Sequence, residues 1–412
     1  GKMTKKASTP ALRFKGFTYT WEQRKLSEFA DKVTEKNVGL QYIETFTNSA
    51  EFGIISQRDF FDHDIAKMSS LGGYYIVRSE DFVYNPRIST SAPVGPINRN
   101  KLGRIGVMSP LYTVFRPHDI GTTYLEHFFK SKYWHSFMNF NGDSGARSDR
   151  FSIKDSVFFE MPIPIPHIEE QRKIGEYLTH LDRLITLHQR KYDKLTNMKK
   201  SMLEKMFPKN GANVPEIRFK GFTDAWEQRK LGEAVQEVTR NDATSDAPIM
   251  MITANNGFIE QSERYAFNNA GESLKKYILL EKGELAYNHG ASKLRPYGSC
   301  FTLTTSENAR IPFVYHCFSA DEQNSEFLSI ELNGADVENQ LRRIVSSGAR
   351  MDGLPNISFQ EYVSVSVLLP TIEEQNKIAD FFKNLDNLIT LHQRELEKLK
   401  NLKKACLEKM FV

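Results

Sequence analysis

Basic and polar side chains suited to nucleic acid gather in segments that the sequence predicts to be loops. Arginine can bind a guanine edge through two hydrogen bonds, and lysine can neutralise a backbone phosphate. Taken singly, each such residue is more often ordinary solvated surface than a contact. The candidates for DNA contact are Asn85, Arg99, Lys101, Arg104, Arg147, Arg150, Asn288, Lys293, Arg295, Tyr297, Arg343 and Arg350.

Two of these candidates belong to a motif that occurs twice. Ser144-Gly-Ala-Arg147 recurs as Ser347-Gly-Ala-Arg350 inside stretches that otherwise differ. A cation present in both copies indicates chemistry common to both, either a phosphate contact or a shared base contact. Unmatched cations such as Arg99 and Lys293 are instead candidates for the choice of sequence.

No catalytic motif accompanies these residues. The sequence has no GxxxxGK[ST] phosphate loop, no GxGxxG, no GxSxG and no HExxH. Asn85-Pro-Arg-Ile88 begins like the Asn-Pro-Pro-Phe motif of amino-methyltransferases, but it lacks the second proline and the stacking aromatic. We therefore expect a chain that is not an enzyme and that carries no metal centre or cofactor of its own.

The composition is that of a globular protein with more than one domain. The chain has 412 residues, of which 40% are hydrophobic and 26% charged, with a net charge of +4 that permits nucleic acid without requiring it. Cys300, Cys317 and Cys406 form no CxxC pair, so we expect no disulfide framework and a reducing, cytoplasmic location. No stretch approaches the roughly 18 apolar residues of a membrane span.

The chain repeats itself, and this repeat is its most informative feature. Between the matching segments the two halves diverge. Shared residues should therefore be scaffold or common chemistry, and differing residues should be what each half recognises. The matching segments, in pairs, are 13–17 with 218–222, 21–26 with 226–231, 168–171 with 372–375, 184–190 with 388–394 and 203–207 with 407–411.

A seven-residue apolar repeat predicts one long helix at the end of each half, roughly 55 Å long at about 1.5 Å per residue. Antiparallel pairing would place the two domains at opposite ends. It would also bring His188 and His392 face to face, where a polar register role is favoured over metal binding. The predicted seam residues are Ile174, Leu181, His188, Leu195, Ile378, Leu385, His392 and Leu399.

The regions before the helices are predicted to be α/β (α+β) recognition domains, so the fold is two repeated domains joined to two long antiparallel coiled-coil helices. Strands are predicted at 74–77, 82–84, 106–108, 112–115, 249–252, 277–280 and 313–315, and helices at 124–137 and 326–344. The expected layout is an N-terminal tail 1–12, a first domain 13–167, a first spacer helix 168–207, a linker 208–217, a second domain 218–371 and a second spacer helix 372–412.

Over residues 10–412 the chain resembles the specificity subunits of type I restriction–modification systems. The resemblance rests on Trp-Glu-Gln-Arg-Lys-Leu at the entry to each half, on Pro166-x-x-Glu-Glu-Gln171 at the entry to the first helix, and on the doubled layout. It implies a non-catalytic, sequence-specific DNA-binding subunit. Each target-recognition domain would read one half of a bipartite target, and the helices would set the spacer.

The resemblance also implies partners and cofactors. The partners are double-stranded DNA, two methyltransferase subunits docked on the helices and, through the complex, restriction (translocase) subunits; no membrane is implied. S-adenosylmethionine, ATP and magnesium are implied for the complex and not for this chain. Two other classes stay open: a self-contained DNA methyltransferase or nuclease, and a coiled-coil scaffold without DNA binding.

Overall fold

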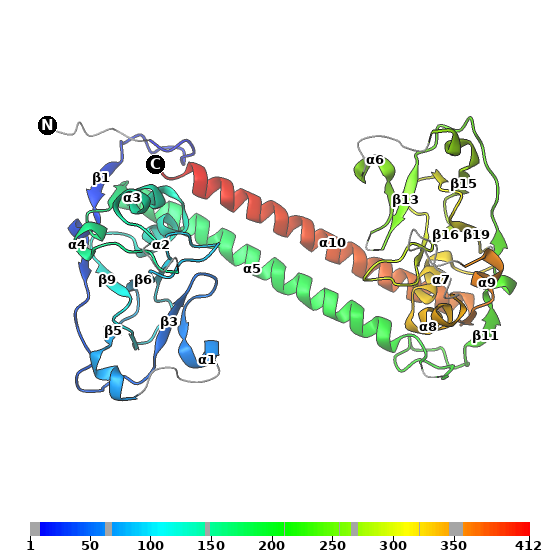
Figure 1. Cartoon of the computed structure of the whole chain (residues 1–412), viewed down its shortest axis with the longest axis horizontal. Helices are drawn as coiled ribbons and strands as arrows, with labels where there is room; N and C mark the ends of the chain where they lie inside the picture. The colour runs from blue at the N-terminus through cyan, green and yellow to red at the C-terminus, as the bar shows by residue number, and fades with distance from the viewer. Residues whose placement is uncertain are drawn as a thin grey trace. The chain divides into compact units, whose positions relative to one another are not determined.

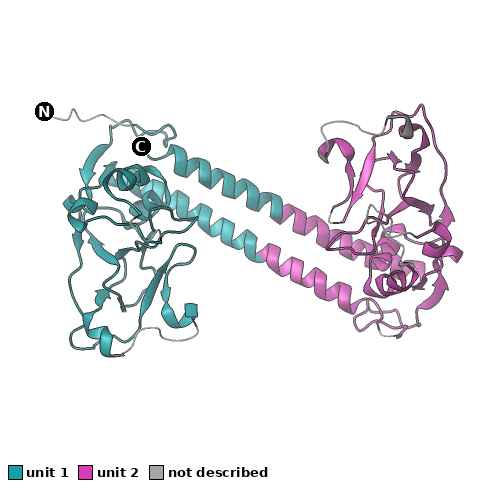
Figure 2. Ribbon diagram, viewed as in Figure 1, with its two compact units in different colours: residues 1–190, 393–412 teal, residues 191–392 magenta. Residues whose placement is uncertain are grey.

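The computed structural model forms two compact units (Figure 2). Unit 1 comprises residues 1–190 and 393–412, and unit 2 comprises residues 191–392. Each unit therefore holds one mixed α/β domain together with one half of each long helix. The residues that the structure describes are 9–61, 68–144, 149–209, 211–254, 256–264, 271–320, 322–345 and 357–412.

Unit 1 is built around a four-stranded antiparallel sheet of order β2-β9-β6-β7, accompanied by the pairs β1-β10, β3-β4 and β5-β8. Phe82 lies opposite Phe115 in this sheet, and their rings stack with centroids 5.5 Å apart in the core. The elements are β1 (Glu22–Lys25), η1 (Leu26–Glu28), β2 (Ala30–Lys32), β3 (Phe46–Ser49), β4 (Gly53–Ser56), α1 (Gln57–Phe61), η2 (Met68–Gly73), β5 (Tyr75–Val77), β6 (Phe82–Tyr84), β7 (Ile97–Arg99), β8 (Gly106–Met108), β9 (Thr113–Pro117), α2 (Thr122–Lys130), α3 (Tyr133–Asn141), α4 (Asp155–Phe158) and β10 (Pro162–Ile165).

Unit 2 has the same plan, with a four-stranded sheet of order β12-β19-β16-β17 and the pairs β11-β20, β13-β14 and β15-β18. Leu285 lies opposite Phe318, as Phe82 lies opposite Phe115 in unit 1. The elements are β11 (Glu227–Lys230), η3 (Leu231–Glu233), β12 (Gln236–Glu237), β13 (Met250–Thr253), β14 (Gly257–Glu260), α6 (Gln261–Arg264), η4 (Gly271–Lys276), β15 (Ile278–Glu281), β16 (Leu285–Asn288), β17 (Ser299–Thr302), β18 (Asn308–Ile311), β19 (His316–Ser319), α7 (Ser325–Leu332), α8 (Ala335–Ile344), α9 (Phe359–Val363) and β20 (Ser366–Leu369).

The strand predictions are confirmed within a residue or two, except at 313–315. That prediction is wrong: these residues form a turn, and β19 begins at His316. The predicted helix 124–137 is two helices, because the Ser131 hydroxyl donates to the Phe128 carbonyl at 2.6 Å and ends α2. The predicted helix 326–344 is likewise two, α7 and α8, separated by Asn333 and Gly334.

The long helices α5 (Ile168–Lys205) and α10 (Ile372–Lys409) run antiparallel within each unit (Figure 1). In unit 1, Tyr177 hydrogen-bonds with Cys406, and further along α5 Asp182 pairs with Lys403, which is earlier in α10. In unit 2, Lys199 Nζ lies 2.5 Å from Asp386 Oδ1. No helix in the described part of the chain has the length and apolarity to cross a membrane.

Four of the eight predicted seam residues lie in the interior of their own unit. Ile174 and Leu181 are buried in unit 1, as are Ile378 and Leu385 in unit 2. The other four are half-buried: Leu195, Leu399, His188 and His392. That the two histidines face each other stays a prediction.

Candidate nucleic-acid interface

The repeated Glu-Glu-Gln motif fastens each domain to its long helix. The buried Glu170 carboxylate accepts hydrogen bonds from Arg13 Nε at 2.7 Å and Nη2 at 2.8 Å, and from Trp21 Nε1 at 3.2 Å. In unit 2, Arg218 Nε and Nη2 each reach the Glu374 carboxylate at 2.7 Å. A charge this deeply buried persists only because it is paired and hydrogen-bonded. The matching ends of the repeat are therefore scaffold.

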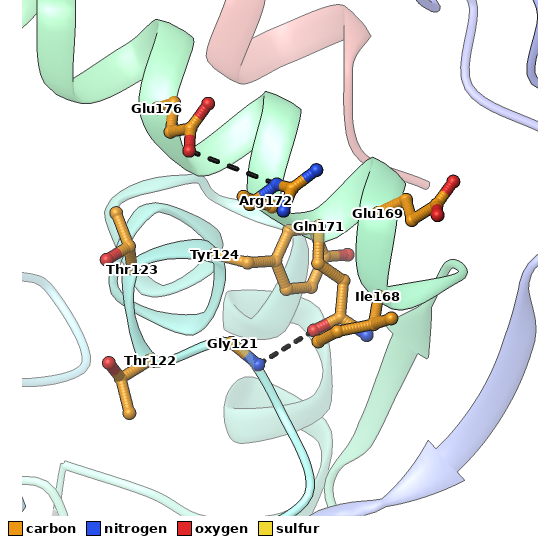
Figure 3. Close-up of a pocket in the computed structure, with 9 residues that line it drawn as sticks. All are labelled: Gly121, Thr122, Thr123, Tyr124, Ile168, Glu169, Gln171, Arg172 and Glu176. Carbon is orange, nitrogen blue, oxygen red and sulfur yellow. Dashed lines mark hydrogen bonds and ion pairs between the residues drawn. The ribbon is translucent and has the colours of Figure 1, made fainter.

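The glutamine of the same motif holds a second joint, which Figure 3 shows in unit 1. Gln171 Oε1 accepts the Gly121 N–H at 2.8 Å, at the start of α2, and its Nε2 donates to the Pro166 carbonyl at 2.8 Å. In unit 2, Gln375 Oε1 accepts the Asn324 N–H at 3.0 Å. A pocket of about 380 Å³ lies beside Gln171, lined by the start of α2 and the first turns of α5.

Asn85, directly after β6, and its counterpart Asn288, at the end of β16, each position a hairpin in their own unit. In unit 1, Asn85 Nδ2 donates to the Asn48 carbonyl of β3 at 2.8 Å. In unit 2, Asn288 Nδ2 donates to the Ile252 carbonyl of β13 at 3.1 Å. The sequence predicts that both residues contact DNA, but each donates its amide N–H to a backbone carbonyl inside its own domain. They hold the β3-β4 and β13-β14 hairpins against the central sheet.

A groove of about 520 Å³ in unit 1 has Arg150 among its lining residues, and Arg150 is the bridge partner of Arg87. Arg87 and Arg150 stand directly opposite each other in an antiparallel bridge, and both side chains are exposed. Like charges in this position repel, and in the described part of the chain neither guanidinium is paired with a carboxylate. An anion such as a phosphate would relieve that repulsion. The groove is lined by Arg150, Lys32, Tyr75, Tyr84, Tyr112, Phe151 and Asp155, among others.

Comparison with known proteins identifies the family. A family model described as "Type I restriction modification DNA specificity domain" matches residues 19–197 and again residues 224–401. The chain belongs to this family. Its members are specificity components and not catalytic ones.

Individual specificity subunits are similar to the chain at low sequence identity. The specificity subunit of the type I restriction enzyme MjaVIII of Methanocaldococcus jannaschii is 23% identical over 61% of this chain and 61% of the relative. The putative MjaX specificity subunit of the same organism is 22% identical over 61% of this chain and 59% of its own length. The chain thus matches about three fifths of these relatives. The S subunit of M. genitalium shares the fold, with a TM-score of 0.54 at 14% identity over 98% of this chain and 99% of that one.

In this specificity-family chain, several residues predicted to contact DNA form ion pairs inside their own unit. Arg99 is only 10% exposed and bridges Glu80 at 3.0 Å and Glu126 at 2.5 Å. Lys101 also reaches Glu126, at 2.7 Å. Burial alone would raise the pKa of Glu126, but Lys130, Lys101 and Arg99 outweigh it and lower the pKa to about 2. This network braces β7 against α2. Sequence choice by Arg99, and by Lys101 with its side chain 57% exposed, stays a prediction.

Three further candidates are also engaged within their own unit. Arg104 pairs with the Glu44 carboxylate through two nitrogens, the closer at 2.7 Å. Arg295 donates to the Asn333 carbonyl at 2.6 Å, at the end of α7. The carbonyl of Tyr297 accepts the hydroxyl of Tyr287. The Tyr297 contact is made by its backbone and leaves its side chain a candidate, and the DNA contacts of all three residues stay predictions.

The remaining candidates are exposed or lie outside the described residues. Lys293, on the loop after β16, and Arg343, in the last turn of α8, are exposed. Arg147 and Arg350 lie outside the described residues, so their DNA contacts stay predictions. The parts of the chain that the structure describes hold no group of three or more side chains able to bind a metal ion.

Sequence reasoning missed Arg87, although it inspected the segment that contains it. Asn85-Pro-Arg-Ile88 was compared with a methyltransferase motif, and the third position counted only as a mismatch. The signal is visible only in three dimensions, since Arg87 and Arg150 are far apart in sequence and meet through the bridge.

Proposed function

We propose that this chain reads a bipartite double-stranded DNA target, with each unit reading one half. The observation that carries the proposal is one scaffold used twice with two different surfaces. Both units have the same strand order and the same buried Arg–Glu ion pair, Arg13–Glu170 in unit 1 and Arg218–Glu374 in unit 2. In both, an asparagine also hydrogen-bonds the base of a hairpin. Their exposed side chains differ, as reading two different half-sites requires.

We propose that the long helices set the spacer and dock two methyltransferase subunits. The sequence Leu-Ile-Thr-Leu-His-Gln-Arg is identical at 184–190 and 388–394, and in it both Leu187 and Leu391 are exposed although apolar. An exposed apolar residue repeated at one position fits two copies of one protein partner. Restriction subunits would join through the assembled complex.

In this proposal the cofactors belong to the partners. S-adenosylmethionine would serve the methyltransferase subunits, and ATP with magnesium the restriction subunits. We also place the complex in a reducing cytoplasm. Cys300, Cys317 and Cys406 are free and buried thiols, which need no oxidising compartment.

The first test separates reading from catalysis. We expect the isolated chain to transfer no methyl group from S-adenosylmethionine to DNA, whereas a complex with two methyltransferase subunits should methylate a split target. The readout is methylation-motif sequencing, with the stoichiometry measured by analytical ultracentrifugation. Methyl transfer by the pure chain, abolished by a point mutation within it, would contradict the proposal. So would a stable complex that has no sequence preference.

The second prediction concerns phosphate contacts of Arg150, which lines the groove, and of its bridge partner Arg87. Arg87→Ala and Arg150→Ala should each weaken binding of the assembled complex to all sequences alike. Each should also reduce the slope of log K against log salt by about 1, because one fewer phosphate is neutralised. Neither change should lower the free energy of unfolding, since each removes a like-charge repulsion.

Arg104→Ala is the matched control for these variants. It also removes one positive charge from unit 1, but from a guanidinium already paired with Glu44. Its salt slope should stay at the wild-type value. If all three variants reduced the salt slope equally, net charge, and not the Arg87–Arg150 pair, would account for the effect.

A further inference from the structure

The tip of the β3-β4 hairpin and the helix that follows it present phenylalanines to solvent. Phe52 is 60% exposed, Phe60 41% and Phe61 37%. The rings of Phe52 and Phe60 touch edge to face with centroids 6.1 Å apart, and those of Phe60 and Phe61 with centroids 4.6 Å apart. Figure 1 shows β3 and α1 side by side in unit 1. Such a cluster on a surface marks a site of interaction.

The hairpin that carries Phe52 is held firmly at its base. The buried Asn48 donates to the Val83 carbonyl at 2.7 Å and accepts from Asn98 Nδ2 at 2.7 Å. Asn85 adds its bond to the Asn48 carbonyl at 2.8 Å. At the tip, the N–H of Phe52 donates to Ser49 Oγ at 3.2 Å. A tip fixed in this way can present a side chain in one position, as specific recognition requires.

Unit 2 builds the same hairpin with a different tip. Gly53 and Gly257 both have positive φ, +72° and +65°, and each closes its turn opposite the last residue of the first strand. The residue before this glycine is Phe52 in unit 1 and Asn256 in unit 2. Asn256 is exposed too. The hairpin is therefore shared scaffold, and its tip is not.

This difference decides which partner the tip meets. Two identical protein subunits docked on the two units would need the same surface on both, and among the described residues of unit 2 the hairpin tip carries Asn256 where unit 1 carries Phe52. Two different DNA half-sites need different surfaces. We propose that the β3-β4 hairpin is a base-reading element of unit 1 and that Phe52 packs against the methyl group of a thymine in the major groove. This proposal rests on the bipartite reading above.

The chemistry of the tip fits that contact. A two-stranded ribbon can enter the major groove, where thymine alone among the four bases exposes a methyl group, and phenylalanine packs against it. The contact itself needs no charge; the exposed neighbours of Phe52 at the tip are Ala50 and Glu51. The counterpart Asn256 offers an amide, so the two tips suit different bases.

The test is a base-substitution scan with the assembled methyltransferase complex. Each thymine of the target is replaced in turn by deoxyuridine, which removes the C5 methyl group alone. For the wild type, one such replacement in the half-site of unit 1 should weaken binding about tenfold, within the range of a single base contact. Phe52→Ala should weaken binding to the unmodified target by a similar factor and should then be insensitive to that replacement.

Phe140→Ala is the matched control, because Phe140 is also an exposed phenylalanine of unit 1, 89% exposed, but lies on α3. It should keep the wild-type sensitivity to deoxyuridine. Thermal unfolding of Phe52→Ala at the wild-type temperature would establish that the variant folds. A wild-type complex with a bipartite preference but no deoxyuridine-sensitive thymine in the first half-site overturns the inference alone. The same holds if sensitivity persists in Phe52→Ala. A complex with no sequence preference overturns the proposed function as well.

Discussion

Replacing the segment from about Leu26 to Pro166 with that of a related subunit should change one half of the methylated DNA sequence and leave the other half unchanged. The segment carries the central sheet of unit 1, its hairpin and its groove. The residues that clasp it to the long helix, Arg13, Trp21 and Glu170, lie outside it and would be retained. Methylation-motif sequencing of cells that carry the hybrid gives the result directly.

The reciprocal exchange, from about Leu231 to Pro370, is the control. It should change the other half-site and leave the first unchanged. In the first exchange, the donor segment must pack against Ile174, Leu178 and Leu181, which α5 contributes to the core of unit 1. If either exchange in a folded, assembled hybrid altered both half-sites or neither, the assignment of one unit to each half-site would have to be abandoned.

Glu170→Ala should destabilise unit 1 by about 3–5 kcal/mol, the cost of leaving a buried charge without its partner. Its carboxylate is 1% exposed, and its removal strands the Arg13 guanidinium together with the Trp21 indole N–H. A loss of this size is a large part of the roughly 5–15 kcal/mol that stabilises a typical domain. Chemical denaturation measures the loss, and hydrogen exchange at β1 and β10 assigns it to unit 1.

Two companion variants sharpen this test. Glu169→Ala changes the neighbouring exposed carboxylate and should alter stability by less than about 0.5 kcal/mol. Glu374→Ala should destabilise unit 2 by about 1 kcal/mol less than Glu170→Ala destabilises unit 1, because Trp226 Nε1 has no hydrogen-bond partner among the described residues. Equal, small losses of unfolding free energy for Glu169→Ala and Glu170→Ala would mean that the Arg13–Glu170 ion pair contributes little to stability.

Much of the architecture could be predicted from the repeat and the apolar periodicity. The two long helices, the mixed α/β domains and most strands follow from patterns that are local in sequence, because burial of one helix face or strand face dictates its own spacing. The errors were local as well. The strand predicted at 313–315 is a turn, and the two predicted domain helices are each broken, at Ser131 and at Asn333.

The site depended far more on tertiary contacts. Sequence alone identified which residues are shared by the two halves, but it could not separate a shared DNA contact from a shared internal tie. Asn85 and Asn288 donate to backbone carbonyls within their domains, and Arg99 pairs with Glu80 and Glu126. A sequence does not distinguish an exposed arginine from a buried, paired one, because only the fold decides which carboxylates lie near each guanidinium.

By itself, then, the sequence determined the doubled plan of this protein, since repeats and periodicity are properties of the chain order. The resemblance of its motifs pointed to the specificity family, which the family model establishes. The tertiary structure alone decided which candidate side chains are exposed and which are paired. It paired Arg87 with Arg150 across a bridge and left Phe52 exposed on a hairpin fixed at its base. The physical reason is that exposure and pairing arise from residues distant in sequence that folding brings together or keeps apart.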